Sequence, residues 1–142
     1  MSLDTTLNFN HPVKELIWTT KPSTVNSADS SNLTTVGTGT YQLKLNGHDR
    51  FAAQDTNYFT RVQVWDHHTG FGGYAANSIA VYSFALKPEE HQPSGTCNFS
   101  RIDNAQLQLN TTSVTTPVIK VFAVNYNVLR IMSGMGGLAY SN

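Results

Sequence analysis

Alternating apolar and polar residues mark two short segments of the chain. Residues 41–46 (YQLKLN) place Tyr41 and two leucines on one face, and residues 105–110 (AQLQLN) place two leucines in the same way. Successive side chains of a β-strand point to opposite faces, so this pattern predicts strands with one face on a core and one in solvent. We therefore expect both segments to be half-buried strands.

Further strands are predicted where β-branched and aromatic residues gather without strict alternation. These segments are residues 13–19 (VKELIWT), 58–65 (YFTRVQVW), 79–86 (IAVYSFAL), 118–126 (VIKVFAVNY) and 128–132 (VLRIM). Residues 79–86 are apolar on both faces, as expected for a central strand of a sandwich. The glycines of residues 134–137 are expected to end the regular structure.

Turn and loop signals separate the predicted strands. Residues 21–40 are polar and rich in Ser, Thr and Asn, and Pro88, Pro93 and Gly95 fix a loop at residues 87–95. The spacing gives about eight strands, which is typical of all-β sandwiches and barrels. No segment shows sustained helical periodicity, which disfavours an α/β architecture.

The predicted fold is a single all-β domain over residues 1–142, an eight-stranded antiparallel jelly-roll sandwich. A length of 142 residues fits one domain. An immunoglobulin-like sandwich is the alternative, but its core signature needs two cysteines and the chain has only Cys97. Because Cys97 lies in a strand-like segment, we expect a buried and chemically inert thiol.

The charge balance narrows the possible partners. Lys and Arg number 9, Asp and Glu number 9, and charged residues make up 13% of the chain. Binding to nucleic-acid phosphates needs a surplus of basic side chains, so it is not expected as the main activity. A weakly charged surface also lacks mutual repulsion, which suits a protein that packs against copies of itself. No apolar run approaches the ~20 residues that span a bilayer.

Candidate catalytic and metal-binding residues are few. His67 and His68 would point to opposite faces of a strand, and the His-x-His spacing of a cupin-like enzyme is absent. Residues 89–91 (EEH), together with Asp103, offer carboxylates and a base, but their position between two prolines indicates solvated side chains. We expect no catalytic residue, no metal site and no cofactor.

Most aromatic residues fall in predicted strands and are expected in the core. Phe71 and Tyr74 lie instead in a glycine-rich segment, so we expect them to contact a neighbouring subunit or a ligand. An alternative function follows from this possibility. The chain would then be a jelly-roll carbohydrate-binding module that uses Phe71, Tyr74 or Trp65 as a stacking platform.

Four blocks of the sequence carry a resemblance to a known family: residues 7–18, 41–51, 82–105 and 119–142. The block YSFALKPEEHQPSGTCNFSRIDNA and the tail IKVFAVNYNVLRIMSGMGGLAYSN are the most specific. Their proline, glycine and charged positions would not arise from composition alone. Together the blocks closely resemble the C-terminal part of the major capsid protein of nucleocytoplasmic large DNA viruses.

The resemblance implies that the chain is the second half of a double jelly-roll capsid protein. Three such proteins would form a homotrimer with a pseudo-hexagonal outline, and these capsomers would tile an icosahedral virus shell. The implied partners are further copies, neighbouring capsomers and minor capsid proteins. The implied location is the virion, after assembly in the host cytoplasm. Enzyme activity, direct nucleic-acid binding and membrane insertion are not implied.

The family motif maps onto positions that the resemblance implies to be structural. These positions are Pro88, Pro93, Ser94, Gly95, Arg101 and Asp103. We expect them to shape the loop at residues 87–95 and to supply polar contacts between sheets or subunits. Arg101 and Asp103 stand two apart on a predicted strand and so share one face. We hypothesise that this pair contacts a neighbouring element.

Overall fold

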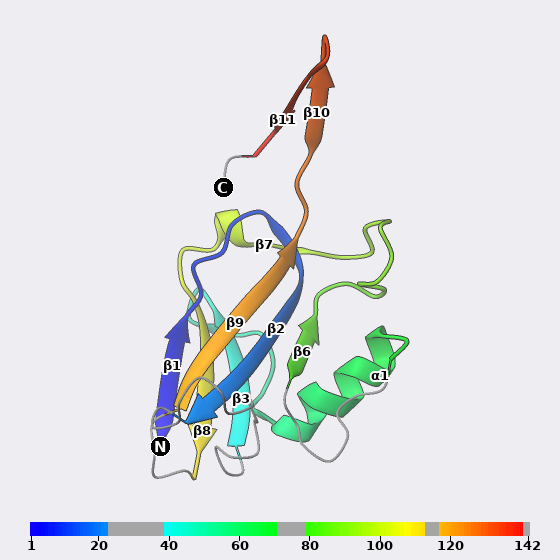
Figure 1. Ribbon diagram of the computed structural model, residues 1–142. Helices are drawn as coiled ribbons and strands as arrows, with labels where there is room; N and C mark the ends of the chain where they lie inside the picture. Colours follow the sequence, from blue (N-terminus) through cyan, green and yellow to red (C-terminus); the bar gives the residue numbers. More distant parts are fainter. Residues whose placement is uncertain (23–38, 71–78, 113–116, 141–142) are drawn as a thin grey trace.

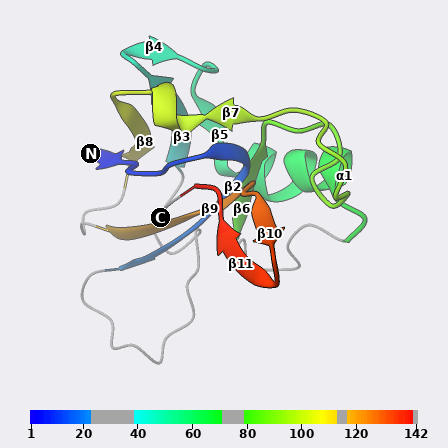
Figure 2. The same ribbon diagram turned by 90° about the horizontal axis from the view of Figure 1, so that it is seen from above.

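Two antiparallel β-sheets enclose the core, and helix α1 lies beside strand β6 (Figures 1 and 2). The computed structural model describes residues 1–22, 39–70, 79–112 and 117–140. The first sheet has the order β1 (Ser2–Thr6), β8 (Ala105–Thr111), β3 (Gly39–Leu45) and β4 (His48–Asp49), with β5 (Gln54–Asp55) also paired to β3. In the second sheet, β2 (Pro12–Pro22) pairs with β6 (Ala80–Ser83) and β7 (Cys97–Asn98) on one side and with β9 (Pro117–Asn125) on the other.

The core lies between the two sheets and is formed by alternate strand positions. Trp18 of β2 packs against Tyr41 of β3 with ring centroids 5.3 Å apart, and the Phe59 ring lies 5.1 Å from Trp18. All three side chains are almost fully buried, and burial raises the pKa of the Tyr41 hydroxyl to about 12. Leucines of β3 and β8 complete this cluster. The half-buried strands predicted at residues 41–46 and 105–110 are confirmed.

The all-β class is confirmed, with differences in individual strands. The strands predicted at residues 13–19, 118–126 and 128–132 correspond to β2, β9 and β10, although residues 126 and 128 fall just outside the observed strands. The strand predicted at residues 79–86 is shorter than expected, because β6 ends at Ser83. It is also not central, since within the described residues it pairs with β2 alone. Strand β1 was not predicted, because its five residues carry a single large apolar side chain.

The prediction of a strand at residues 58–65 is wrong. A π-helical turn (Tyr58–Val62) leads directly into α1 (Gln63–His67). The buried positions follow the spacing of a helix, and they are Thr56, Phe59, Thr60 and Gln63. Only one of these residues is apolar, so the sequence shows no hydrophobic periodicity at the helical period.

Hydrogen bonds explain why this polar stripe of the helix can be buried. Thr56 Oγ1 donates to the Gly39 carbonyl at 3.0 Å, and Thr60 Oγ1 donates to the Thr56 carbonyl at 3.2 Å. Gln63 Nε2 donates to the Tyr58 hydroxyl at 2.8 Å. These bonds offset the cost of removing the polar groups from water. The helix is therefore fixed by specific partners as well as by the Phe59 ring.

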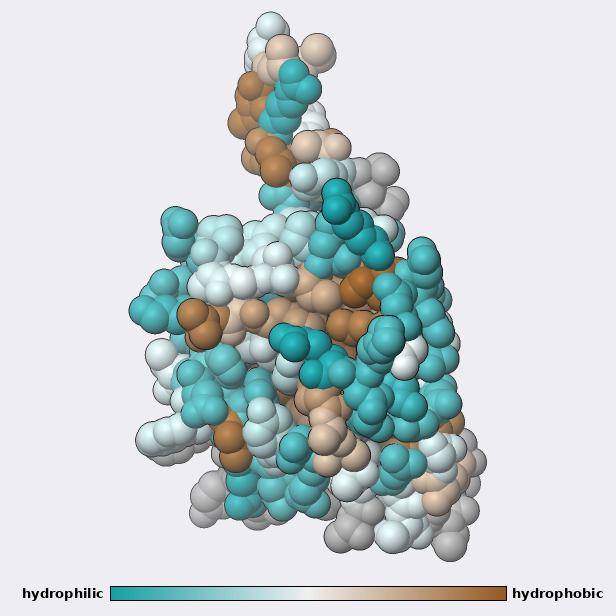
Figure 3. All heavy atoms as spheres, turned by 180° about the vertical axis from the view of Figure 1, so that it is seen from behind, coloured by the Kyte–Doolittle hydropathy of each residue, from teal (hydrophilic) through white to brown (hydrophobic). Residues whose placement is uncertain are grey.

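The C-terminal hairpin extends away from the two sheets (Figures 1 and 3). It consists of β10 (Leu129–Met132) and β11 (Met135–Leu138), and every residue of both strands is exposed. Its turn residues, Ser133 and Gly134, have φ values of 51° and 77°. Positive φ at both positions matches the tight turns that fit the twist of a hairpin. The expectation that the glycines of residues 134–137 end the regular structure is therefore wrong.

Asn127 closes the base of the hairpin with its side chain. Its Oδ1 accepts from the Val128 N–H at 2.7 Å and from the Tyr140 N–H at 3.2 Å. Its Nδ2 donates to the Tyr140 carbonyl at 3.1 Å. The Tyr140 ring also lies 5.5 Å from the His11 ring, centroid to centroid. The hairpin is thus attached to the rest of the domain at its base.

Candidate functional site

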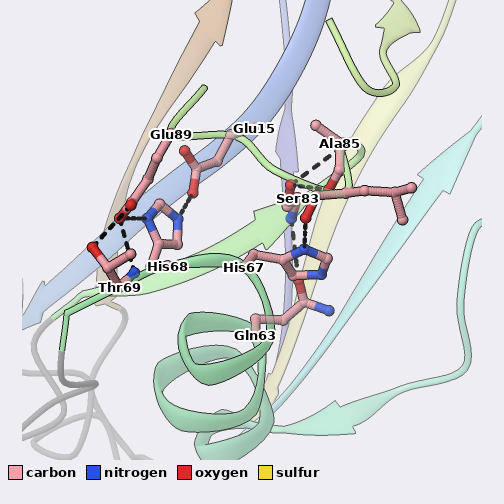
Figure 4. Close-up of polar contacts among 9 residues, drawn as sticks. Glu15, Gln63, His67, His68, Thr69, Ser83, Ala85 and Glu89 are labelled. Atoms are coloured by element: carbon pink, nitrogen blue, oxygen red, sulfur yellow. Dashed lines mark hydrogen bonds and ion pairs between the residues drawn. The ribbon is translucent and has the colours of Figure 1, made fainter. Parts of the chain in front are cut away.

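Three segments that are distant in sequence meet in a polar cluster beside the end of α1 (Figure 4). Glu15 comes from β2, His68 directly follows α1, and Glu89 comes from the loop at residues 87–95. His68 Nε2 contacts Glu15 Oε1, and His68 Nδ1 lies 3.1 Å from Glu89 Oε1. The imidazole therefore bridges two carboxylates, one buried and one exposed.

Thr69 holds the second carboxylate in place. Its backbone N–H donates to Glu89 Oε1 at 3.0 Å, and its hydroxyl donates to Oε2 at 2.9 Å. These two bonds, the backbone one first, lower the pKa of Glu89 below its usual value. The expectation that this glutamate is simply solvated is therefore incomplete, since three atoms of His68 and Thr69 contact its carboxylate.

The arrangement around His68 joins three segments of the chain, and we call it the clamp. A neutral imidazole donates one hydrogen bond, so the ring satisfies both carboxylates only when both nitrogens carry protons. Such a ring joins β2 to the 87–95 loop through charge-assisted bonds. In the part of the chain that the structure describes, no His, Cys, Asp and Glu side chains are grouped so as to hold a metal ion.

A second polar network fixes the end of β6 to the helix (Figure 4). The Ser83 N–H donates to Gln63 Oε1 at 3.2 Å, and the Ser83 hydroxyl donates to the Ala85 carbonyl at 2.7 Å. His67 Nδ1 lies 3.2 Å from the Leu86 carbonyl oxygen. Side chains of α1 therefore bind the backbone at and just after Ser83, where β6 ends.

The motif positions in the 87–95 loop shape its backbone. Pro88 is buried, whereas Pro93 is exposed. The Ser94 hydroxyl accepts from the Lys87 N–H at 3.0 Å and so ties the two ends of the loop together. Gly95 has a φ of 144°, and a Cβ there would lie 2.6 Å from the Phe84 carbonyl oxygen. A side chain at this position would be both strained and sterically blocked.

The other two motif positions are not on a strand, which corrects the sequence interpretation. Arg101 ends a 3-10 turn (Phe99–Arg101), where Asn98 Oδ1 accepts from the Ser100 N–H at 3.1 Å. Asp103 lies in the following bend, and its N–H donates to Asn46 Oδ1 at 3.0 Å. Both side chains are exposed, and no ion pair joins either of them to another described residue.

The remaining candidate residues differ in their surroundings. Phe71 and Tyr74 lie outside the described residues. Trp65 is 80% exposed on α1, beside a hollow of about 260 Å³ that His68, Thr69 and Gly70 help to line. Cys97 is half-buried and not fully buried as expected, and its partial burial raises the pKa of the thiol, which lowers its reactivity.

Strand β9 presents apolar side chains on both of its faces. The inward side chains, such as Val121, pack against the core, whereas the outward ones are exposed. The outward set consists of Val118, Phe122 and Val124, with Lys120 among them. Phe122 is 57% exposed and lies opposite Ile17 of β2. No helix of the described residues is long and apolar enough to cross a membrane.

Comparison with known proteins gives a consistent result. The major capsid protein of Pyramimonas orientalis virus is 52% identical over 156 residues, which cover 96% of this chain and 38% of that protein. The crystal structure of VP54 of PBCV-1, fitted into a reconstruction of the virophage Sputnik, matches with a TM-score of 0.77 and 35% identity, over 100% of this chain and 46% of that one. A quasi-atomic model of the PBCV-1 capsid matches with a TM-score of 0.75, 35% identity and the same coverage.

The chain thus spans less than half the length of these relatives. The family model described as large eukaryotic DNA virus major capsid protein matches residues 2–137, which is nearly the whole chain. The resemblance seen in the four sequence blocks is confirmed by these matches. The chain belongs to the family of large eukaryotic DNA virus major capsid proteins.

Proposed function

We propose that this domain is a structural element of a virus shell and acts through self-association. The observation that carries the proposal is the match to PBCV-1 protein in a capsid model, over the full length of this chain. In the full-length protein, the domain would be the second of two jelly rolls. Three copies would form a pseudo-hexagonal capsomer, and neighbouring capsomers would build an icosahedral capsid in the virion.

The surface of the domain supports this proposal. Apolar side chains are exposed on β9 and on the hairpin, and the formal net charge is zero. Such surfaces favour contacts between proteins. Assembly in the host cytoplasm and contacts with minor capsid proteins belong to the same proposal. Direct nucleic-acid binding and membrane insertion do not, because the chain has no basic surplus and no described helix that could span a bilayer.

The motif residues would serve this structural role. Pro88, Pro93, Ser94 and Gly95 would give the 87–95 loop one shape, which the Glu89 clamp fastens to the sheet. Arg101 and Asp103 are free to contact a neighbouring subunit, since both side chains are exposed. An Arg101→Ala variant that folds and assembles as the wild type does would contradict a role of this arginine between subunits.

The test is the native gene product that contains this sequence. Its intact mass should be several-fold larger than the 15.6 kDa of this chain, and electron microscopy should show trimers with a pseudo-hexagonal outline. A native product of about 15.6 kDa that stays monomeric would contradict the proposal. The carbohydrate-binding function would then become the first candidate.

The carbohydrate-binding alternative is favoured by one observation, the exposed Trp65 beside a hollow that His68 and Thr69 also line. An exposed indole can stack on the face of a sugar ring. Titration of the chain with a panel of oligosaccharides, followed by tryptophan fluorescence, tests this alternative. A saturable change that disappears in Trp65→Ala would support it, whereas Trp18 is buried and serves as the internal reference.

A further inference from the structure

The strands of the C-terminal hairpin are apolar in sequence but exposed to solvent. Large apolar side chains occupy most of its strand positions, yet Leu129 is 66%, Ile131 is 67% and Met135 is 76% exposed. A two-stranded hairpin is at best marginally stable in water, and it gains stability by packing against another surface. Among the described residues, no second layer covers the apolar side chains of the hairpin as it does those of the two sheets.

The two faces of the hairpin differ in chemistry. Leu129 pairs with Leu138, and Ile131 pairs with Gly136, so these residues share one face. The opposite face carries Arg130 and Met132 with their partners Gly137 and Met135. The first face, which we call the aliphatic face, has three branched side chains and no charge. It is the face better suited to burial, since the opposite face carries the charge of Arg130 beside Met132 and Met135.

A matching surface exists on the same domain. The outward side of β9 exposes Val118, Phe122 and Val124 with Lys120 among them, and Ile17 of β2 lies opposite Phe122. We call this set the β9 face. Strand β9 runs from Pro117 to Asn125 and is longer than the four-residue strands of the hairpin, so the hairpin can lie along it. Two apolar sheet faces of this kind pack by interdigitating their side chains.

A chain cannot place its own hairpin on its own β9 face in this arrangement. Strand β9 runs toward the hairpin, and the hairpin continues beyond the end of β9 (Figure 1). The Tyr126 N–H donates to the Pro12 carbonyl at 2.9 Å, and Asn125 Nδ2 donates to the Asn10 carbonyl at 3.2 Å. These bonds hold the end of β9 to the body and would break if the hairpin folded back. Each chain therefore carries both the aliphatic face and the β9 face, but the two faces can pack together only between two copies.

We propose that the aliphatic face of the hairpin packs on the β9 face of a second copy of this chain. The contact is heterologous, since a different surface is used on each partner, and such contacts close into rings when the rotation permits. The inference rests on the proposed capsid function, because a shell places copies side by side. It goes beyond that function by assigning the contact to Leu129, Ile131 and Leu138 on one side and Phe122 on the other.

The first test measures self-association of the 142-residue chain by light scattering coupled to size-exclusion chromatography. A Leu129→Thr/Ile131→Thr variant removes the aliphatic face but keeps residues that favour strands. We expect its association to weaken at least about tenfold, the effect of losing one well-buried contact. The matched control, Arg130→Thr/Met132→Thr, alters the opposite face of the same strand and should associate as the wild type does.

The second test establishes which surfaces meet. In a Cys97→Ser background, one protein carries Ile131→Cys and a separate protein carries Phe122→Cys. After mixing and mild oxidation, we expect a disulfide between the two proteins, because each hairpin lies on the β9 face of the other chain. Replacing Ile131→Cys by Met132→Cys moves the thiol to the opposite face and should reduce the yield of the mixed disulfide.

The outcomes separate this inference from the function on which it rests. If the aliphatic-face variant associates like the control, or if Met132→Cys cross-links as well as Ile131→Cys, the inference is wrong. A wild-type chain that stays monomeric and gives no mixed disulfide also overturns it. The capsid function is judged independently, by whether the native gene product forms trimers. Circular dichroism of each variant confirms that the sheets are intact, which is expected because the changed residues are exposed.

Discussion

The two-sheet body and the C-terminal hairpin use similar side chains in opposite ways. In the body, Leu107 of β8 is 1% exposed, whereas in the hairpin Leu129 is 66% exposed. Both leucines lie on antiparallel strands with regular pairing. The difference is that the body supplies its own second layer and the hairpin does not. Apolar residues in a strand thus indicate that a surface is to be covered, but not which molecule covers it.

The largest expected effect comes from truncating one leucine in each region. Leu107→Ala should lower the free energy of unfolding by about 3 kcal/mol, because it leaves a cavity between the sheets. Leu129→Ala should change it by less than about 0.5 kcal/mol in dilute solution, where the side chain is already in water. Urea denaturation followed by circular dichroism measures both. Equal losses would mean that the hairpin is part of the cooperative body.

Breaking the clamp around His68 should have the next largest effect. His68→Ala leaves the buried carboxylate of Glu15 without its partner, at a cost of about 2 kcal/mol in the free energy of unfolding. His48→Ala is the control, because His48 lies on the exposed strand β4. Thermal unfolding of both variants at neutral pH tests the clamp. If the two variants melt alike, His68 does not fasten the 87–95 loop to the body.

Two glycines extend the comparison to the backbone. Gly95→Ala should destabilise the domain by about 1–3 kcal/mol, because φ is positive and the new Cβ meets the Phe84 carbonyl. Gly137→Ala in the hairpin meets nothing within 4 Å and should change stability by less than about 0.5 kcal/mol. Chemical denaturation distinguishes the two. A tolerated alanine at position 95 would contradict the loop geometry described above.

The smallest effect is expected in acid and is confined to the loop at residues 87–95. Because the Thr69 bonds lower the pKa of Glu89, the folded state holds this carboxylate charged at a pH where the unfolded chain is protonated. The stabilisation is present above the usual glutamate pKa of 4.5 and is lost as the pH falls through the lowered value. The protection of amides near Glu89 from hydrogen exchange, relative to the intrinsic rate at each pH, should therefore fall in acid, and Glu89→Gln should remove most of this dependence on pH. The hairpin, which has no carboxylate, is the internal control.

The sequence allows the strands of the body to be predicted where one face is apolar and the other polar. It fails at the helix because Thr56, Thr60 and Gln63 are buried through hydrogen bonds, and hydrophobic periodicity cannot detect them. A spacing of three, four and seven residues from Thr56 would have been the available signal. The second strand of the hairpin, β11, is not predicted, because a glycine after a strand is typical of the end of regular structure, whereas Gly134 forms a tight turn.

The candidate site was less predictable than the fold. The loop at residues 87–95 could be placed from its prolines and glycine, and the positive φ of Gly95 agrees with that prediction. The clamp could not, because Glu15, His68 and Glu89 are separated by 53 and 21 residues and meet only in the folded chain. Neither residue type nor spacing in sequence indicates such a contact.

The strand pairing of the body also has a consequence for how the protein is made. Ser2 pairs with Asn110, and Thr20 pairs with Ile119, so both N-terminal strands wait for partners about a hundred residues downstream. Closing such long loops is slow compared with forming local hairpins. On the ribosome, β1 must therefore remain unpaired until β8 has emerged. Strand β2 can pair with β6 earlier, but it lacks β9 on its other side. During that interval the nascent chain exposes Leu16 and Trp18, and exposed apolar side chains of this kind are what chaperones bind.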